Sequence, residues 1–270
     1  MSASDRPVCL TIAGLDPSGG AGIVADIKTF TAFGCFATAG ISSVTFQNTT
    51  GVFGAVHQTA ESVRRQVEPV LDDFEVAAIK TGMLPTREII EETSRLIRSR
   101  NLANIVVDPV VRSTSGFDLI DDEALRSLID VLFPAATVVT PNLPEAERIC
   151  RFKIESEKDI AEAAEAMLAM GAASVLIKGG HAADGARTAV DHLFTEGRHV
   201  RFEAEFIQTT STHGTGCTLS AAIAANLALG KNLEEAVGTA KEFVFEGIRT
   251  AKQFGKGHSP VNIPAIWPVE

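Results

Sequence analysis

The sequence predicts an α/β fold in which a mostly parallel central sheet has helices on both faces and a small antiparallel margin. Short β-branched runs alternate with longer helical patterns over the 270 residues. The run NIVVDPVV at 104–111 is almost continuously apolar, which is typical of a strand buried on both faces. The segment 191–207 carries Glu196-Gly197 between two alternating halves, which indicates a hairpin and hence the antiparallel margin.

Periodicity places the individual elements. The expected strands are short and rich in β-branched residues: Val8–Ile12, Ala77–Ile79, Ile105–Val107, Thr137–Thr140 and Ser174–Ile177. The expected helices are longer and amphipathic or small-residue-rich: Ala21–Ala32, Glu61–Leu71, Arg87–Ser99, Asp122–Leu132, Leu143–Cys150, Asp159–Met170, Cys217–Leu229 and Leu233–Gln253. No low-complexity linker or internal repeat interrupts them, so we predict one domain spanning residues 1–270.

Composition excludes several classes of protein. A formal net charge of -10 argues against a nucleic-acid binder. The chain has no run of 18 apolar residues and its first residues lack a signal-peptide pattern, so we expect no membrane segment. The 4 cysteines form no CxxC pair, which gives no sign of a zinc site or a disulfide framework. A reduced, cytoplasmic enzyme is the simplest interpretation.

In open α/β sheets the ligand lies beyond the carboxyl ends of the strands, so the residues that follow each strand are the candidates for chemistry. The first such segment is GLDPSGGAG, from Gly14 to Gly22. It matches neither a Walker A loop nor a clean GxGxxG fingerprint. Its glycines fit a tight strand-to-helix turn as well as a ligand-binding loop, and the sequence leaves both open.

A second glycine cluster runs from His213 to Thr218. Backbone N–H groups of Gly214, Thr215 and Gly216 at a helix start can converge on an anion. Cys217 falls in the first helical turn, where the helix dipole favours the thiolate, and a base there could take a proton from a hydroxyl group. The alternative is a buried cysteine that only packs at a helix start.

Four more polar residues follow strands. Asn142 and Glu145 suit Mg²⁺, often through water, or simply cap a helix. Lys178 could reach a polyphosphate or be a solvated strand-end lysine. Asp108 could form a turn or face the phosphates. Three histidines without a partner pattern are expected on the surface: His57, His192 and His199.

Taken together, these segments resemble the hydroxymethylpyrimidine/phosphomethylpyrimidine kinases, the thiamine-pathway branch of the ribokinase superfamily. The strings that carry the resemblance occur in family order and cover about residues 10–225: TIAGLDPSGGAGIVADIKTF, FQNTTGV, KTGML, VVDPV with STSG, TPNLPEAE, LIKGGH and THGTGCTLSAAIA. The resemblance implies a ribokinase-like three-layer fold, MgATP as co-substrate and a homodimer. Two successive phosphorylations of a hydroxymethylpyrimidine are implied as the activity.

The resemblance also implies roles for individual residues. Cys217 matches the catalytic base, with Gly214, Thr215 and Gly216 as the anion hole. Asn142 and Glu145 match the motif that organises Mg²⁺ and the phosphates, Asp108 would help to position the metal, and Lys178 would neutralise the nucleotide phosphates. The residues expected around the pyrimidine are Gly14, Asp26, Val44, Gln47 and Met83. Gln47 can serve a ring nitrogen and an exocyclic amine because its amide both donates and accepts.

Two other functions remain open. A pyridoxal or pyridoxine kinase would share the glycine-cysteine motif and also act on a hydroxymethyl heteroaromatic. A non-catalytic ligand sensor on the same fold would be expected to lose the base, the metal motif or the anion hole, and this chain keeps all three. The sequence argues against a sugar kinase, because the catalytic base of sugar kinases is usually an aspartate, whereas this chain has Cys217 at that position.

Overall fold

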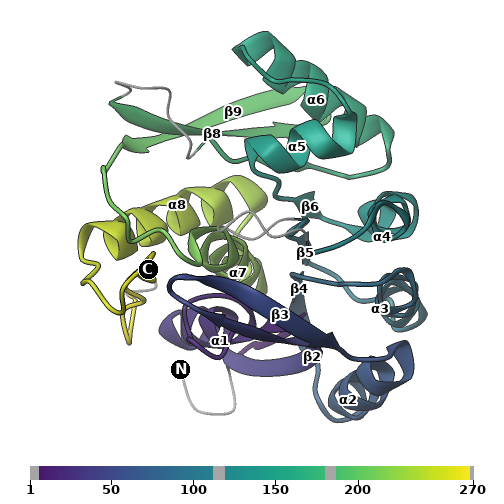
Figure 1. Cartoon of the computed structure of the whole chain (residues 1–270). Helices are drawn as coiled ribbons and strands as arrows, with labels where there is room; N and C mark the ends of the chain where they lie inside the picture. The colour runs from purple at the N-terminus through teal and green to yellow at the C-terminus, as the bar shows by residue number, and fades with distance from the viewer. Residues whose placement is uncertain (1–5, 112–118, 180–186, 268–270) are drawn as a thin grey trace.

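The computed structural model describes residues 6–111, 119–179 and 187–267. Its centre is a nine-stranded sheet in the order β3-β2-β1-β4-β5-β6-β7-β8-β9 (Figure 1). Strands from β2 to β7 in that order run parallel, while β3 pairs antiparallel with β2 at one edge and β8 and β9 pair antiparallel at the other. The strands are β1 (Val8–Leu15), β2 (Phe36–Asn48), β3 (Gly51–His57), β4 (Val76–Thr81), β5 (Ile105–Val107), β6 (Val138–Val139), β7 (Val175–Ile177), β8 (Thr188–Thr195) and β9 (Arg198–Glu205).

Helices cover both faces of this sheet, as Figure 1 shows. On one face lie α1 (Gly22–Ala32), α7 (Thr215–Ala228) and α8 (Leu233–Arg249). On the other lie α2 (Ala60–Asp73), α3 (Arg87–Ser99), α4 (Asp122–Ser127), η2 (Leu128–Leu132), η3 (Phe133–Ala135), α5 (Leu143–Cys150) and α6 (Glu157–Ala169). The fold is therefore the predicted three-layer α/β/α arrangement.

Strand alternation builds one hydrophobic core on each face. Cys9 packs in the core under α1, α7 and α8, whereas the next residue, Leu10, packs in the core on the opposite face. Likewise, Val106 packs in the core under α1, α7 and α8, and Val107 packs in the core on the opposite face. Because both faces of the central strands are buried, β5, β6 and β7 are apolar at every position, as the run at 104–111 predicted for β5.

The structure confirms every strand and helix expected from the sequence, with small shifts at their ends. The hairpin at 191–207 is β8 and β9, turning at Glu196-Gly197 as predicted. The helix expected at Asp122–Leu132 is helical throughout, but its last turn widens into the π-helix η2.

No strand was predicted at β2 or β3, the antiparallel hairpin at the other edge. Ala, Gly, Ser and Thr make up much of β2, and β3 contains two glycines, so neither has the apolar alternation that marks a strand. The surface expectation for His192 was wrong: its side chain is buried, and its Nδ1 lies 3.1 Å from His199 Nε2.

Within the described parts of the chain, no helix combines the length and the apolar character needed to cross a membrane.

Candidate active site

Two cavities lie beyond the carboxyl ends of the parallel strands. The smaller one encloses about 160 Å³. Its walls come from segments that follow four neighbouring strands, represented by Asp16 after β1, Met83 after β4, Asp108 after β5 and Asn142 after β6, together with the start of α7. Parallel strands bring these distant segments to one edge of the sheet, which is why the polar residues after the strands meet there.

The residues expected around the pyrimidine divide into two groups. Gly14, Gln47 and Met83 line the smaller cavity. The Gln47 Nε2 donates to Thr45 Oγ1 at 2.6 Å, and Thr45 Oγ1 donates to the Leu15 carbonyl at 2.9 Å, so the amide is held in a fixed position. A Cβ at Gly14 would lie 3.2 Å from the Met83 sulfur, so glycine there preserves the cavity.

Val44 and Asp26 do not line this cavity. Val44 pairs with Leu15 across β1 and β2, next to Thr45, which is the residue that faces the cavity. Asp26 lies behind the cavity wall, fully buried, and receives hydrogen bonds from Lys80 Nζ at 2.9 Å and Thr11 Oγ1 at 2.6 Å.

Lys80 was not identified from the sequence, although the string KTGML contains it. Its side chain is completely buried, and it lines the smaller cavity together with Cys217. Burial disfavours the ammonium, but the charges of Asp26 and of the nearby Cys217 and Asp108 raise the pKa of Lys80 above its ordinary value. A fixed positive charge therefore stands beside the proposed base.

The glycine cluster forms the start of α7. Gly214 is the N-cap and has a left-handed backbone, φ 78°, and a Cβ there would overlap the Gly20 carbonyl oxygen. Glycine is thus required for the turn that leads into the helix. The N–H groups of the first helical turn have no partners within the helix. The Thr215 N–H donates to the Thr212 carbonyl at 3.3 Å, so the N–H groups that face an anion at this helix start are those of Gly216 and Cys217.

The expectation that the helix start favours the Cys217 thiolate does not hold in the structure. Burial raises the pKa of Cys217 to about 11, although Lys80 and a hydrogen bond from the Gly22 N–H lower it. Removal of the thiolate from water outweighs the dipole and the nearby cation. At neutral pH the free protein therefore holds this residue mainly as a thiol.

Asp108, Glu145 and Lys178 form a buried cluster between the sheet and α5. Lys178 Nζ lies 2.9 Å from Asp108 Oδ1 and 3.9 Å from Glu145 Oε2. Burial raises the pKa of Asp108, but the opposing effects of Lys178 and Lys80 are larger, and the net pKa is below the ordinary value. Burial, with the help of Asp108, raises the pKa of Glu145 to about 7 despite Lys178.

The cap interpretation of Asn142 and Glu145 is confirmed. Asn142 Oδ1 accepts from the Glu145 N–H at 2.9 Å, and Glu145 Oε2 accepts from the Asn142 N–H at 2.8 Å, a capping box at the start of α5. Both residues also line both cavities. The cap thus fixes the Glu145 carboxylate at the cavity wall.

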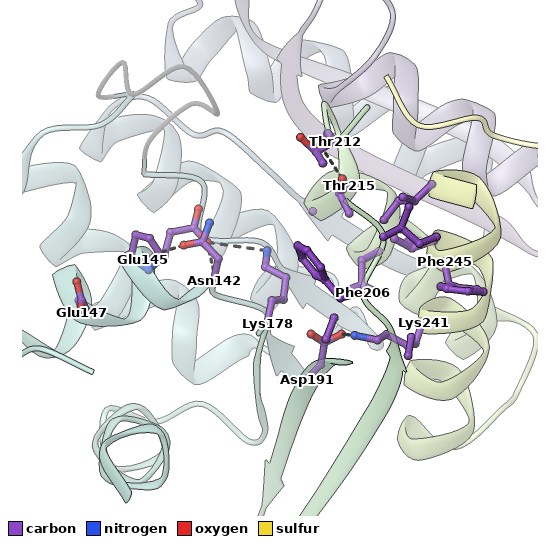
Figure 2. A pocket seen from close by; sticks show the side chains of 18 of the residues that line it. Asn142, Glu145, Glu147, Lys178, Asp191, Phe206, Thr212, Thr215, Lys241 and Phe245 are labelled. Atoms are coloured by element: carbon purple, nitrogen blue, oxygen red, sulfur yellow. Dashed lines mark hydrogen bonds and ion pairs between the residues drawn. The ribbon is translucent and has the colours of Figure 1, made fainter. Parts of the chain in front are cut away.

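The larger cavity encloses about 820 Å³ and opens between α5, the β8–β9 hairpin and α8 (Figure 2). Figure 2 shows Phe206 and Phe245 on one side of it and Asn142, Glu145 and Lys178 on the other. The two cavities share six lining residues: Asn142, Glu145, Lys178, Thr212, Thr215 and Gly216. The Asp191–Lys241 ion pair lies at the phenylalanine end as well. A cavity that combines phenylalanine side chains with lysines suits a nucleotide, with its base among the phenylalanines and its phosphates near a cation.

Asp16 and His213 were also missed as site residues. The Asp16 carboxylate accepts hydrogen bonds from the Ser18, Gly20 and Ala21 N–H groups, and it pairs with His213 Nε2 at 2.8 Å. One buried carboxylate therefore orders the glycine loop and ties it to the residue before the N-cap of α7. An aspartate between glycines was the only sequence signal for it.

Two of the strings that carried the family resemblance fall partly outside the described residues. The undescribed parts are STSG at 113–116, which accompanies VVDPV, and the last two residues of LIKGGH, 180–181.

The described residues offer only part of a coordination shell for a metal ion. They contain no group of three or more His, Cys, Asp or Glu side chains that could hold a metal ion without other ligands. Asp108 and Glu145 provide two buried carboxylates at the junction of the cavities. Mg²⁺ is commonly held by one or two carboxylates together with substrate phosphates and water, so this donor set fits that ion.

The phosphomethylpyrimidine kinase family model matches residues 16–262. A hydroxymethylpyrimidine/phosphomethylpyrimidine kinase from Haemophilus influenzae is 41% identical over 255 residues, covering 94% of this chain and 95% of the relative. The solved phosphomethylpyrimidine kinase from Clostridium difficile is 41% identical, with a TM-score of 0.79, over 90% of this chain and 100% of that one. A Bacillus subtilis pyridoxal kinase solved with ADP is 36% identical, with a TM-score of 0.88, over 97% and 98%.

Proposed function

The chain belongs to the phosphomethylpyrimidine kinase family, and on that premise we propose that it phosphorylates 4-amino-5-hydroxymethyl-2-methylpyrimidine in two steps. The first step transfers the γ-phosphoryl group of ATP to the alcohol. The second transfers another to the resulting monophosphate, which gives the pyrophosphate used in thiamine biosynthesis. We propose that the whole chain acts as one kinase unit.

The junction of the two cavities carries this proposal. ATP would occupy the larger cavity with its phosphates toward Lys178, and the pyrimidine would occupy the smaller one. Both cavities reach Thr215 and Gly216 at the start of α7. A donor and an acceptor bound in this way would meet where backbone N–H groups and a lysine can stabilise the charge of the transferring group.

Cys217 would act as the base in the first transfer. It would take the proton of the hydroxymethyl group as the alcohol oxygen attacks the γ-phosphoryl, with ADP as the leaving group. Backbone N–H groups at the start of α7, such as that of Gly216, would hold the transferring group. Gln47, fixed by Thr45, would recognise the edge of the ring.

Asp108 and Glu145 would hold the Mg²⁺ that accompanies the nucleotide, and that ion would neutralise phosphate charge. Only the carboxylate form of Glu145 can serve as a ligand, and its pKa is raised to about 7. The Mg²⁺ concentration that gives half the maximal rate should therefore rise about tenfold per pH unit below pH 7 and level off above it. Titrations with Mg²⁺ between pH 5.5 and 8.5 measure this.

Glu145→Gln should remove that pH dependence and require more Mg²⁺ at every pH. If the variant and the wild-type protein needed the same Mg²⁺ concentration, Glu145 would be a helix cap only.

We further propose a homodimer formed through the β2–β3 edge. Phe46, Phe53 and Val56 are 52%, 68% and 54% exposed there, and β3 has one unpaired edge. An exposed apolar edge strand presents unpaired backbone groups with which a second chain can pair. Light scattering should give a mass of roughly twice the 28.6 kDa of one chain. Phe53→Glu should lower the measured mass to that of one chain, because it would bury an unpaired charge in the interface. A monomeric wild-type protein would refute the proposal.

The four free cysteines suit a reducing compartment, and we propose that the enzyme works in the cytoplasm. Its presence in the cytoplasmic fraction of lysed cells is the expected result, and recovery elsewhere would contradict it.

ADP release tests the function. The purified protein is given MgATP with hydroxymethylpyrimidine, its monophosphate or pyridoxal, and the first two should be used far more efficiently. A second candidate, pyridoxal kinase, is favoured by the TM-score of 0.88 to the Bacillus subtilis enzyme. Preference for pyridoxal would establish that candidate, and no turnover with any acceptor would point to a ligand sensor.

A further inference from the structure

The segment that follows α8 contacts two different walls of the smaller cavity. Figure 1 shows this C-terminal segment, in yellow, beside the tip of the β2–β3 hairpin. The hairpin carries Thr45, Gln47 and Val52 into the cavity. The second wall begins at His213, immediately before the anion hole. We call residues 254–261 the C-terminal brace.

The first contact is made to the turn of the hairpin, Thr49-Thr50. Thr49 Oγ1 accepts hydrogen bonds from the N–H groups of Lys256 and Gly257, both at 3.2 Å. The Thr49 carbonyl accepts another from the His258 N–H at 2.7 Å. A Cβ at Gly257 would overlap the backbone of Thr49, so the fit depends on glycine there.

The second contact is made to the start of the anion hole. The His213 N–H donates to the Ser259 carbonyl at 3.1 Å, and the Val261 N–H donates to the His213 carbonyl at 3.3 Å. Ser259 is fully buried, and its Oγ bonds the N–H and the carbonyl of Phe254, both at 2.7 Å. These bonds close residues 254–259 into a compact loop.

The end of the brace is anchored as well. The Asn262 N–H donates to the Gly247 carbonyl in α8 at 3.0 Å, and Asn262 Nδ2 donates to Thr250 Oγ1 at 2.9 Å. One short loop thus links α8, the anion hole and the hairpin tip, three elements that are far apart in the sequence.

We propose that the C-terminal brace sets the position of the β2–β3 hairpin relative to the anion hole, which makes Thr49 a positioning residue for the acceptor. The inference rests on the proposed function for its substrate, the hydroxymethylpyrimidine. Thr49 does not touch the cavity; it acts through the hairpin that presents Gln47. Small displacements of a bound acceptor lower the reaction rate by large factors. Fixing the hairpin at its tip would therefore keep the acceptor in its reactive position.

Thr49→Val tests the proposal because valine keeps the shape of threonine but cannot accept the two N–H bonds. We expect the KM for hydroxymethylpyrimidine to rise about tenfold, with the KM for MgATP unchanged within about twofold. Thr50→Val is the matched control: Thr50 Oγ1 bonds only Asn48 Oδ1 within the turn, at 2.7 Å, and this variant should behave as wild type. Equal KM values in Thr49→Val and Thr50→Val would overturn the proposal.

A substrate-independent measurement separates this inference from the proposed function. In the ligand-free protein, amide hydrogen exchange in residues 44–57 should be about tenfold faster in Thr49→Val than in Thr50→Val, because the hairpin tip is released. Equal exchange in the two variants would refute the brace even if the pyrimidine is the substrate. Faster exchange in Thr49→Val would support it even if the acceptor proves to be another heteroaromatic alcohol.

Discussion

Cys217→Ala is expected to lower the rate of the first phosphoryl transfer on the order of a thousandfold, the usual contribution of a general base. Transfer to the monophosphate should fall within about tenfold of the wild type, because a phosphate nucleophile has no alcohol proton to lose. MgATP should still bind. Product-resolved initial rates with each acceptor measure the difference between the two steps.

The pH dependence of the first step gives a second measure of the same residue. Burial raises the pKa of Cys217 to about 11, so the thiolate fraction, and with it the wild-type rate, should rise about tenfold per unit from pH 7 to 9. The variant should lose this rise. Cys150→Ala, which changes a half-buried cysteine that lines neither cavity, is the control and should keep it. A Cys217→Ala enzyme with an unchanged first step would remove the proposed base.

Lys178→Met should lower both transfers on the order of a hundredfold, because the lysine is expected to balance charge on the nucleotide phosphates in each of them. The substitution also leaves Asp108 and Glu145 buried without their cation, 2.9 and 3.9 Å from the former ammonium position. The pKa of Glu145, already about 7, should then rise further, since Lys178 lowers it. Saturation kinetics with MgATP for both acceptors check the result.

Lys231→Met is a suitable control for Lys178→Met. Lys231 donates to Thr239 Oγ1 at 3.1 Å and lines neither cavity, so its loss should leave both rates near wild type. Circular dichroism establishes whether the Lys178 variant is folded. A folded Lys178→Met protein that kept either transfer rate would contradict the role given to this lysine.

The sequence located the active-site edge because that information is local. The parallel strands β1, β4, β5, β6 and β7 are short and mostly apolar, and the residues after them, such as Asp108 and Lys178, are read directly from the chain. The fold then brings those segments together, since all parallel strands end at one edge. The start of α7 was found in the same way, from glycines next to a helical pattern.

Contacts between distant segments could not be read from the sequence. Lys80 looks like an ordinary strand residue until the sheet places it, fully buried, against Asp26. The pairing of Asp16 with His213 joins residues 197 positions apart. Neither has a local pattern of its own.

The Cys217 thiolate shows a different limit. The helix dipole favours an anion at a helix start, and the sequence does predict that Cys217 lies at a helix start. The degree of burial decides the outcome, however, and burial depends on the whole fold.

One site is proposed to phosphorylate the pyrimidine alcohol and then its monophosphate. The most direct test is ³¹P NMR of the purified protein with MgATP and equal amounts of hydroxymethylpyrimidine and pyridoxal. Pyrimidine monophosphate should appear first and be converted to the pyrophosphate, while pyridoxal phosphate stays a minor product. Formation of pyridoxal phosphate as the main product, or consumption of ATP without either pyrimidine product, would contradict it.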